Sequence, residues 1–331
     1  MSETKFDVVG IGNAIVDIIG QCNDDFLAQH GAPKGHMRLV DAETVSRLYE
    51  AMGPTVEVSG GSVANTMVGI ASFGGRAAFI GKVAEDDFGR IFAHDIRAAG
   101  VHFSTPPSSS GIPTARCLVL VTPDGERTMN TYLGISPDLD DGEVDPELIR
   151  SAGIIFLEGY LFDRPEAKAA FRQAASIAAE AGRKVALSLS DGFCVDRHRK
   201  EFLDLVRNSV DILIANETEI TSLYQVDTFE KAMEHAQADT ELAVLTRSAK
   251  GSVICAKSRE PISIPAMPVN VVDVTGAGDL YAAGFLFGYA RGFSLETAGR
   301  LGSIAAAEVI SHFGARPQKN LAELARAQGL L

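Results

Sequence analysis

The chain has 331 residues, with 43 Asp and Glu against 30 Lys and Arg and a formal net charge of −13. This length allows one large α/β domain or two smaller ones, and the acidic balance argues against nucleic acid as a partner. No apolar stretch is long enough to span a bilayer, the first five residues lack the apolar core of a signal peptide, and the four cysteines show no C-x-x-C spacing. We therefore expect a cytoplasmic protein with reduced thiols and no membrane partner.

The first strand is expected from Lys5 to Gly12, a mostly apolar run that reads as buried and ends in glycine. Gly10-Ile11-Gly12 begins like a dinucleotide-binding fingerprint, but Ile15 stands where the third glycine belongs. A second strand-like run follows at 14–19 instead of a helix. A Walker A loop is missing as well. These departures argue against an NAD-dependent oxidoreductase and a P-loop enzyme.

Four short segments predict the strands of a small β-sheet lid, at 34–40, 55–58, 112–121 and 127–133. A turn sequence joins the last two, which therefore predict a hairpin. An amphipathic helix is expected at 42–52, and another helix follows the glycine pair Gly60-Gly61. The lid is thus predicted from parts of 13–58 and 111–133.

From residue 146 onward, helical and strand patterns alternate regularly. Strands are expected at 153–157, 184–189, 210–215, 242–246 and 252–256, with helices at 164–181 and 198–206 among them. Continuous apolar strands separated by amphipathic helices indicate a parallel sheet covered on both faces. The predicted fold is therefore α/β: a single domain over 1–331, with a doubly wound, mostly parallel sheet flanked by helices, into which the lid is inserted.

The stretch Asp273-Val274-Thr275-Gly276-Ala277-Gly278-Asp279 follows a strand-like run at 269–272 and opens an apolar helical run at 280–289. Glycines let the backbone turn sharply into the helix, whose first amides have no intrahelical partner. Because the helix dipole makes these amides electropositive, they form a site for an anion such as a phosphoryl group. Asp279 can accept the proton of an attacking hydroxyl there. This combination describes phosphoryl transfer from a nucleotide to an alcohol.

This heptad resembles the second signature of the ribokinase-like (phosphofructokinase-B type) carbohydrate kinases, D-T-x-G-A-G-D, and departs from it at Val274. The stretch from Ser59 to Asn65 resembles the first signature, G-G-x-x-x-N. The resemblance covers nearly the whole chain, from Phe6 to about Pro317. It implies a ribokinase-like fold and a phosphotransferase with an alcohol acceptor. The amides of Gly276, Ala277 and Gly278 would hold the developing charge, and Asp279 would be the base.

The resemblance also implies an acceptor site. Asn13-Ala14-Ile15-Val16-Asp17 is similar to the N-terminal substrate motif of the family, in which the aspartate binds sugar hydroxyls. A carboxylate suits the vicinal diol of a ribose. A solvent-facing aspartate on an edge strand is the alternative for Asp17. Gly60 and Gly61 would let the substrate approach the backbone, and Asn65 would turn its amide toward it.

The implied nucleotide site lies in the second half of the chain. Asn216-Glu217-Thr218-Glu219 resembles the family's N-x-x-E motif, whose glutamate organises Mg²⁺ through water around the ATP phosphates. Alternatively, Asn216 is an N-cap and the acids occupy the first turn of a helix. Residues 246–251 resemble the ATP loop, which implies Thr246 and Gly251 near phosphate and ribose. The tail at 305–316 would supply an apolar wall for the ATP base.

The family also suggests a monovalent cation such as K⁺ near Asp273 and the loop around Gly314.

Several places resemble the adenosine kinase branch of the family. Arg127 would shield the transferring phosphoryl group, and Phe193 would stack on a nucleobase. Five further residues are implied as contacts to the base: Ile15, Met37, Leu39, Thr131 and Leu133. As an alternative, Phe193 and Leu133 belong to the core.

The resemblance therefore implies an ATP- and Mg²⁺-dependent kinase that phosphorylates the primary 5′-hydroxyl of a ribonucleoside, with adenosine as the expected acceptor. A sugar kinase of the same fold is the alternative. A non-catalytic nucleotide-binding regulator is more remote, because Asp279 and Glu219 are intact. The oligomeric state stays open between a monomer and a homodimer.

Overall fold

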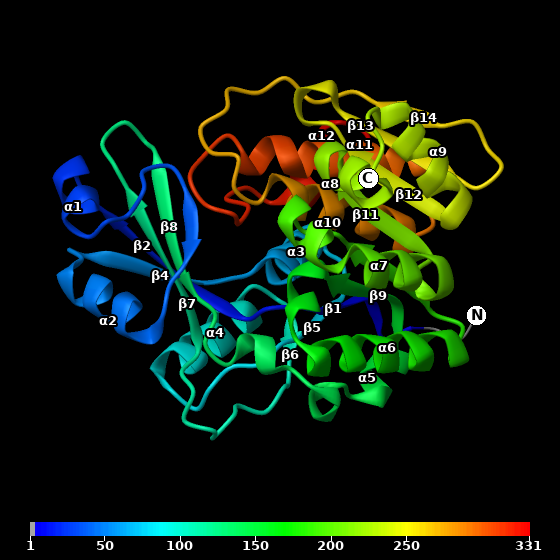
Figure 1. The fold of residues 1–331 in the computed structure, drawn as a ribbon. Helices are drawn as coiled ribbons and strands as arrows, with labels where there is room; N and C mark the ends of the chain where they lie inside the picture. Colours follow the sequence, from blue (N-terminus) through cyan, green and yellow to red (C-terminus); the bar gives the residue numbers. More distant parts are fainter. Residues whose placement is uncertain (1–3) are drawn as a thin grey trace.

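A computed structural model describes residues 4–331, so the expectation for the N-terminus at residues 1–3 lies outside the described part. Nine strands form the larger sheet, in the order β14-β13-β12-β11-β10-β9-β1-β5-β6 (Figure 1). Neighbouring strands from β12 to β6 run parallel, while β13 and β14 are antiparallel. Their bounds are β1 Phe6–Ile11, β5 Ala77–Ile80, β6 His102–Phe103, β9 Ala152–Glu158, β10 Lys184–Ser188, β11 Ile212–Asn216, β12 Leu242–Thr246, β13 Ser252–Ala256 and β14 Ile262–Ile264.

Helices cover both faces of this sheet because its strands are apolar on both sides. Along β1, Val8 packs into one core, whereas Val9 and Ile11 pack into the other. The first core includes α3 Ser62–Ser72, α4 Asp87–Ala98, α10 Ala277–Ala290, α11 Leu295–Val309 and α12 Leu321–Ala327. The second includes α5 Pro146–Arg150, α6 Pro165–Glu180, α7 Gly192–Ser209, α8 Glu217–Tyr224 and α9 Phe229–Asp239. Short 3₁₀ turns are η1 Ser136–Asp138, η2 Asp141–Glu143, η3 Gly159–Asp163 and η4 Ser248–Lys250.

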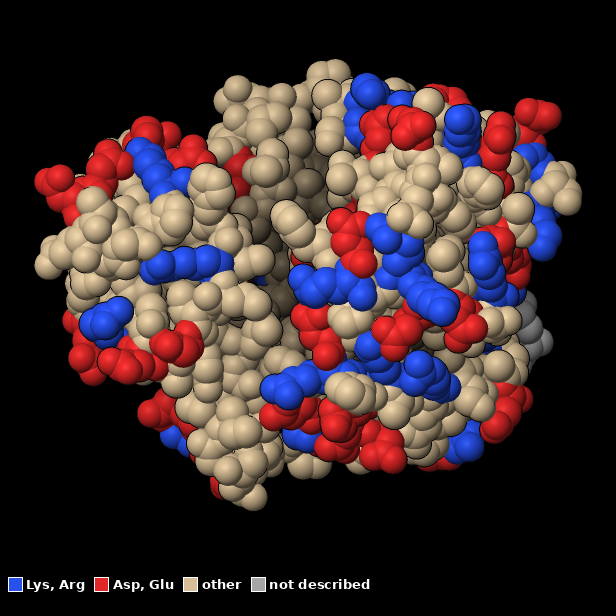
Figure 2. All heavy atoms as spheres, in the orientation of Figure 1, with Lys and Arg blue, Asp and Glu red and all other residues tan. Residues whose placement is uncertain are grey.

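A second sheet of five strands, called the small sheet below, has the order β3-β8-β7-β2-β4. Its bounds are β2 Ile15–Gln21, β3 Met37–Leu39, β4 Thr55–Gly60, β7 Ala115–Val121 and β8 Arg127–Tyr132, with α1 Asp24–Gln29 and α2 Ala42–Ala51 beside it. Buried side chains of α2 and β2 share a core on one face. The other face carries Asp17 and looks toward the larger sheet, and Figure 2 shows a hollow between the two parts.

The α/β fold with a doubly wound sheet is confirmed, and most expected elements lie within a few residues of their predicted bounds. The parallel assignment was wrong for 252–256, because β13 follows β12 after a connection too short for a crossover and pairs antiparallel. The strand expected at 269–272 is also wrong: this segment is irregular, and Val271 and Val272 are exposed. None of the helices in the described chain has the length and apolarity that crossing a bilayer requires.

Helices α10 and α11 pack closely where Gly284 faces α11. A Cβ added at Gly284 would stand 2.4 Å from the backbone carbonyl of Leu301. The Gly284→Ala variant should therefore lower the free energy of unfolding by about 2 kcal/mol, measured in urea. Gly53→Ala is the matched control, since a Cβ there would meet nothing within 4 Å. Equal stability of the two variants would contradict the close packing.

Candidate active site

Helix α10 begins at Ala277, and Asp279 lies in its first turn. One carboxylate oxygen accepts a hydrogen bond from the Ser62 hydroxyl at 2.6 Å, and the other accepts from the Asn65 amide at 3.0 Å. Burial raises the pKa of Asp279, and these two hydrogen bonds oppose the rise. The structure therefore holds this carboxylate in a fixed orientation beside the start of a second helix.

That second helix, α3, starts directly after the small sheet. Its N-cap is Gly61, with φ of 101°, and a Cβ at this position would stand 2.2 Å from the Asn13 carbonyl oxygen. Asn65 is buried one turn later, and its side-chain carbonyl oxygen has no hydrogen-bond partner among the described residues. A buried acceptor in this state points to a donor supplied by a ligand.

The amides at the start of α10 are differently engaged. Gly276 is the N-cap with φ of 79°, and the Ala277 N–H donates to the Val274 carbonyl at 3.2 Å. Of the three amides expected to hold a phosphoryl group, the Ala277 amide is thus already used in a turn. Gly276 and Gly278 remain the better candidates for an anion.

Glu158 is a site residue that the sequence analysis missed. It ends β9 and is 1% exposed, and its carboxylate accepts from the Val63 N–H at 3.1 Å at the start of α3. It also accepts from the Asn13 side-chain amide at 2.6 Å, while Ser136 donates to the Asn13 carbonyl oxygen at 3.0 Å. Asn13, expected to bind substrate, is therefore buried and occupied in holding Glu158. A polar residue ending a central parallel strand is the signal that could have found Glu158.

Asp17 projects from β2 toward the same place. Its carboxylate lies against Gly60, because a Cβ added at Gly60 would stand 2.4 Å from Asp17 Oδ2. Burial raises the pKa of Asp17 to about 6, and the charges of Arg316 and Arg127 oppose the rise. Asp17 is thus no solvent-facing side chain, and it shares one site with Asp279, whose charge also acts on it.

Arg127 is paired within the protein, and its expected role over the transferring phosphoryl group stays a prediction. Its guanidinium pairs with the Asp273 carboxylate at 3.1 Å, and both side chains are less than one-tenth exposed. The same carboxylate accepts from the Thr275 N–H and hydroxyl and from the Gly314 N–H. Because its charge is neutralised and its oxygens are occupied, the Asp273 side chain does not fit a monovalent cation.

On the nucleotide side, Asn216 ends β11 and caps α8. The Asn216 side-chain oxygen accepts from the Glu219 N–H at 2.9 Å, so Asn216 is an N-cap, as the alternative had it. The Glu219 carboxylate in turn accepts from the Asn216 N–H at 2.9 Å and from its side-chain amide at 2.6 Å. Burial raises the pKa of Glu219 to about 7. The described residues hold no group of three or more His, Cys, Asp or Glu placed for a metal ion. A role for Glu219 through water bound to MgATP still fits, since Mg²⁺ keeps waters and phosphate ligands.

Thr246 ends β12, and Gly251 follows η4 with φ of 84°. Both lie where strands β11 and β12 end, because Thr246 is the register partner of Asn216, the last residue of β11. The structure therefore brings the four expected nucleotide residues to one side of the sheet.

An aromatic wall borders the site. Phe193 is 79% exposed in the first turn of α7, which rules out a core position, and Tyr160 is 39% exposed in η3. The two segments are neighbours, because β9 and β10 pair in parallel and end together. The sequence analysis missed Tyr160. Burial raises the pKa of its phenol most, and the charges of Asp191 and Asp279 raise this pKa further.

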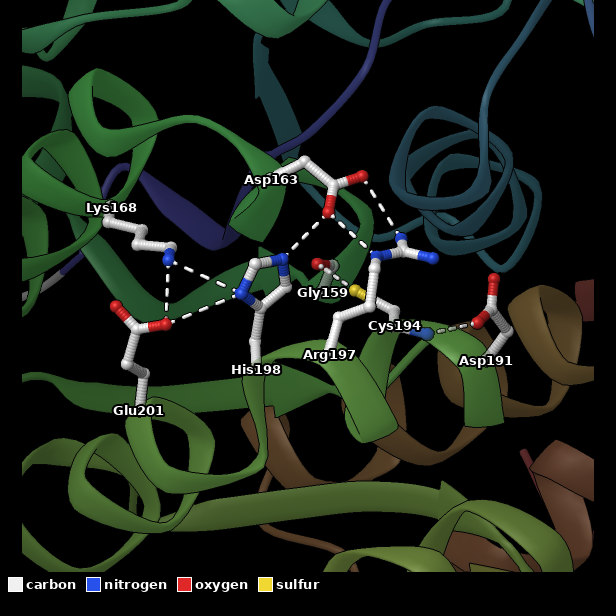
Figure 3. Close-up of polar contacts among 8 residues, drawn as sticks. All are labelled: Gly159, Asp163, Lys168, Asp191, Cys194, Arg197, His198 and Glu201. Carbon is white, nitrogen blue, oxygen red and sulfur yellow. Dashed lines mark hydrogen bonds and ion pairs between the residues drawn. The ribbon is translucent and has the colours of Figure 1, made fainter.

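Polar contacts fix the segment that carries Phe193 (Figure 3). The Asp191 carboxylate accepts the N–H three residues on and caps α7. Asp163 accepts two hydrogen bonds from Arg197, at 3.1 and 3.0 Å, and contacts His198 Nε2 at 2.7 Å. The helix is kinked at His198. These contacts tie α7 to η3 and fix the backbone segment from which the exposed ring projects.

The expected base contacts on the small sheet share one face. Leu39 pairs with Thr131, which pairs with Cys117, and Cys117 pairs with Asp17. Met37 and Leu39 are 51% and 60% exposed, whereas Ile15 and Leu133 are half-buried and Thr131 is buried. An exposed apolar surface thus lies beside Asp17.

The tail does not form a purely apolar wall. Ala305 and Val309 belong to α11 and are buried in the core. Arg316 donates to the Ser59 carbonyl oxygen of the small sheet at 2.6 Å. Arg316 therefore belongs to the acceptor side of the site.

The chain is similar to known proteins in sequence and in structure. Residues 43–321 match the model of the pfkB family carbohydrate kinases. The chain is 51% identical to the structure of adenosine kinase from Sinorhizobium meliloti, covering 98% of this chain and 99% of that one with a TM-score of 0.90. It is 50% identical to a probable sugar kinase from Rhizobium etli, covering 99% and 100%, with a TM-score of 0.91. It is also 32% identical to a probable chloroplastic fructokinase-6 of Arabidopsis thaliana, over 79% of this chain and 70% of that protein.

The buried Glu158 makes stability depend on pH. Burial raises the pKa of Glu158 from 4.5, the value in the unfolded chain, to about 7 in the folded protein. The stability that the protonated side chain contributes is therefore complete at a pH below 4.5, and it is lost as the pH rises through about 7. Glu158→Gln removes this titration. The variant should therefore gain stability relative to wild type between about pH 5 and about pH 8, by at most roughly 3 kcal/mol, measured by urea unfolding.

Glu234→Gln, at an exposed position on α9, is the control and should show a difference from wild type that does not change over this range. A Glu158→Gln difference that is equally constant would contradict the raised pKa.

Proposed function

The chain belongs to the pfkB family of carbohydrate kinases, and within this family we propose that it transfers the γ-phosphoryl group of MgATP to the 5′-hydroxyl of a ribonucleoside. Adenosine is the proposed acceptor and AMP the product. Family membership makes the protein a phosphotransferase that acts on an alcohol. The choice of acceptor and the roles of individual residues are the proposed part.

In the proposed mechanism, the acceptor hydroxyl lies beside Asp279 and gives its proton to this carboxylate as it attacks the γ-phosphorus. Ser62 and Asn65 hold the carboxylate in position, which favours a near-attack geometry. The amides of Gly276 and Gly278 stabilise negative charge on the phosphoryl oxygens. Closure of the small sheet would exclude water from the reacting atoms.

The ribose would be held from the other side. Asp17 accepts from the vicinal hydroxyls, and the unpaired carbonyl oxygen of Asn65 offers a further acceptor. Gly61 lets the substrate approach the backbone closely. This arrangement suits a ribose whose 5′-carbon points toward Asp279.

The observation that carries the choice of a nucleoside is apolar and aromatic surface on both sides of the hollow. Phe193 and Tyr160 are exposed on the larger part, and Met37 and Leu39 are exposed on the small sheet. A planar base requires such walls, whereas a free sugar requires polar groups around it. Similarity to the Sinorhizobium meliloti adenosine kinase supports the same acceptor.

A sugar is the second candidate acceptor. The probable sugar kinase of Rhizobium etli is as similar to this chain as the adenosine kinase is, and the polar side of the site would bind a sugar equally well.

Asp279→Asn should fold and bind both substrates, yet its kcat should fall on the order of 10³-fold, because the variant has no base for the acceptor hydroxyl. Coupled ADP-release kinetics would give kcat, and calorimetry would give the two dissociation constants. Asp227→Asn, exposed between α8 and α9, is the matched control and should keep wild-type kcat. Near-wild-type turnover of Asp279→Asn would remove the base from the proposal.

The acceptor can be identified by direct competition. Adenosine should give the highest kcat/KM in a panel of nucleosides, ribose and fructose, and Phe193→Ala should raise the KM for adenosine about tenfold with little change for any sugar turned over. Phe293→Ala, an exposed ring after α10, serves as the control. Higher kcat/KM for a sugar would establish the second candidate.

A further inference from the structure

Arg316 is attached to the small sheet from the C-terminal side. One guanidinium nitrogen donates to the Ser59 carbonyl oxygen at 2.6 Å and to the Ser59 hydroxyl oxygen at 2.9 Å. Ser59 in turn donates its N–H, at 2.7 Å, and its hydroxyl, at 2.6 Å, to Asp95 of α4. Since Ser59 and Asp95 are fixed by β4 and α4, the guanidinium has a defined position.

The loop that carries Arg316 is held just as firmly. The buried Glu308 carboxylate accepts from the N–H groups of Gln318 and Lys319 at 3.0 and 2.9 Å, and contacts His312 at 3.1 Å. A Cβ added at Gly276 would stand 2.8 Å from the Cα of Ala315. The residue next to Arg316 therefore packs directly on the loop that starts α10.

This position places the guanidinium beside the segment of β4 on which the Asp17 carboxylate lies. Ser59 immediately precedes Gly60, against which the Asp17 carboxylate lies. The positive charge of Arg316 acts on Asp17 and on Asp279, and for both it opposes the rise in pKa that burial causes. Burial lowers the pKa of Arg316 itself to about 10, so the side chain stays protonated at neutral pH.

The negative charge of Asp279 in turn raises the pKa of titratable groups other than Arg316, all of which are acidic. They come from four elements around it, namely Asp17 of β2, Glu158 of β9, Tyr160 of η3 and Glu219 of α8. The basic side chain that acts on Asp279 among the described residues is Arg316. Without a cation, like charges in a desolvated site favour protonation of one or more carboxyls.

We propose that Arg316 is a positioning residue whose guanidinium, seated between the small sheet and the start of α10, keeps Asp17 and Asp279 ionised together. Asp17 is then able to accept from the acceptor hydroxyls while Asp279 takes the proton of the attacking one. The inference rests on the proposed kinase function and adds to it a residue for which the signature motifs of the sequence gave no role.

The test is the pH dependence of kcat in charge-removing and charge-keeping variants. Arg316→Gln should move the acidic limb of the kcat profile upward by roughly one pH unit, because the pKa of Asp279 rises without the cation. The KM for the acceptor should rise as well, since Asp17 is more often protonated. Arg316→Lys should restore both. Arg90→Gln removes an exposed positive charge of α4 and should leave the profile at wild type.

An unmoved acidic limb in a folded Arg316→Gln protein would overturn the proposal, as would failure of Arg316→Lys to restore the limb. Should the Arg316→Gln protein not fold, Ser59→Ala is the second variant, because it removes one hydrogen-bond acceptor of the guanidinium but keeps the charge. Ser59→Ala should shift the acidic limb of the kcat profile upward as well. An unshifted limb in this variant would then overturn the proposal. Wild-type turnover in Asp279→Asn would instead show that the proposed base is wrong, so the two failures are distinguishable.

Discussion

The contact between the first turns of α3 and α10 is the interaction on which the site depends. Asp279 accepts from Ser62 and Asn65, and the Thr66 hydroxyl donates to the Asp279 backbone carbonyl at 3.1 Å. Helix α3 begins where the small sheet ends, whereas α10 begins where the C-terminal loop packs. These hydrogen bonds therefore fix the two helices relative to each other, and with them the small sheet and the C-terminal loop. The Asp279 carboxylate is thus oriented before any substrate binds.

Electrostatics set the second constraint, because an acidic chain has to place a polyanionic nucleotide next to several carboxylates. The structure handles this locally. Glu158 and Glu219 accept hydrogen bonds within the protein. The few cations are placed individually: Arg127 neutralises Asp273, and Arg316 lies near Asp17 and Asp279. Local placement, rather than net charge, decides where negative charge is tolerated.

The sequence predicted the parts of the molecule that depend on local patterns. Apolar strands such as β1 and the glycine-rich starts of α3 and α10 are read from neighbouring residues, so their existence and the position of Asp279 followed directly. The partners of Glu158, Tyr160 and Arg316 are distant in sequence and are fixed only by the sheet order and the packing of loops. A local signal exists for Glu158, which ends a central strand, whereas no local pattern marks Tyr160 and Arg316. For the same reason, the pairing of Arg127 with Asp273 was not foreseen.

The central position of β1 has a consequence for biosynthesis. This strand is made before both of its neighbours in the sheet, β5 on one side and β9 on the other. The Asn13–Glu158 hydrogen bond that follows the second pairing joins residues 145 apart. At a ribosomal rate of about 10 residues per second, the N-terminal segment waits on the order of 15 s for its second neighbour. During this interval β1 lacks its second neighbour, and an unpaired apolar edge of this kind favours association with other unfolded segments.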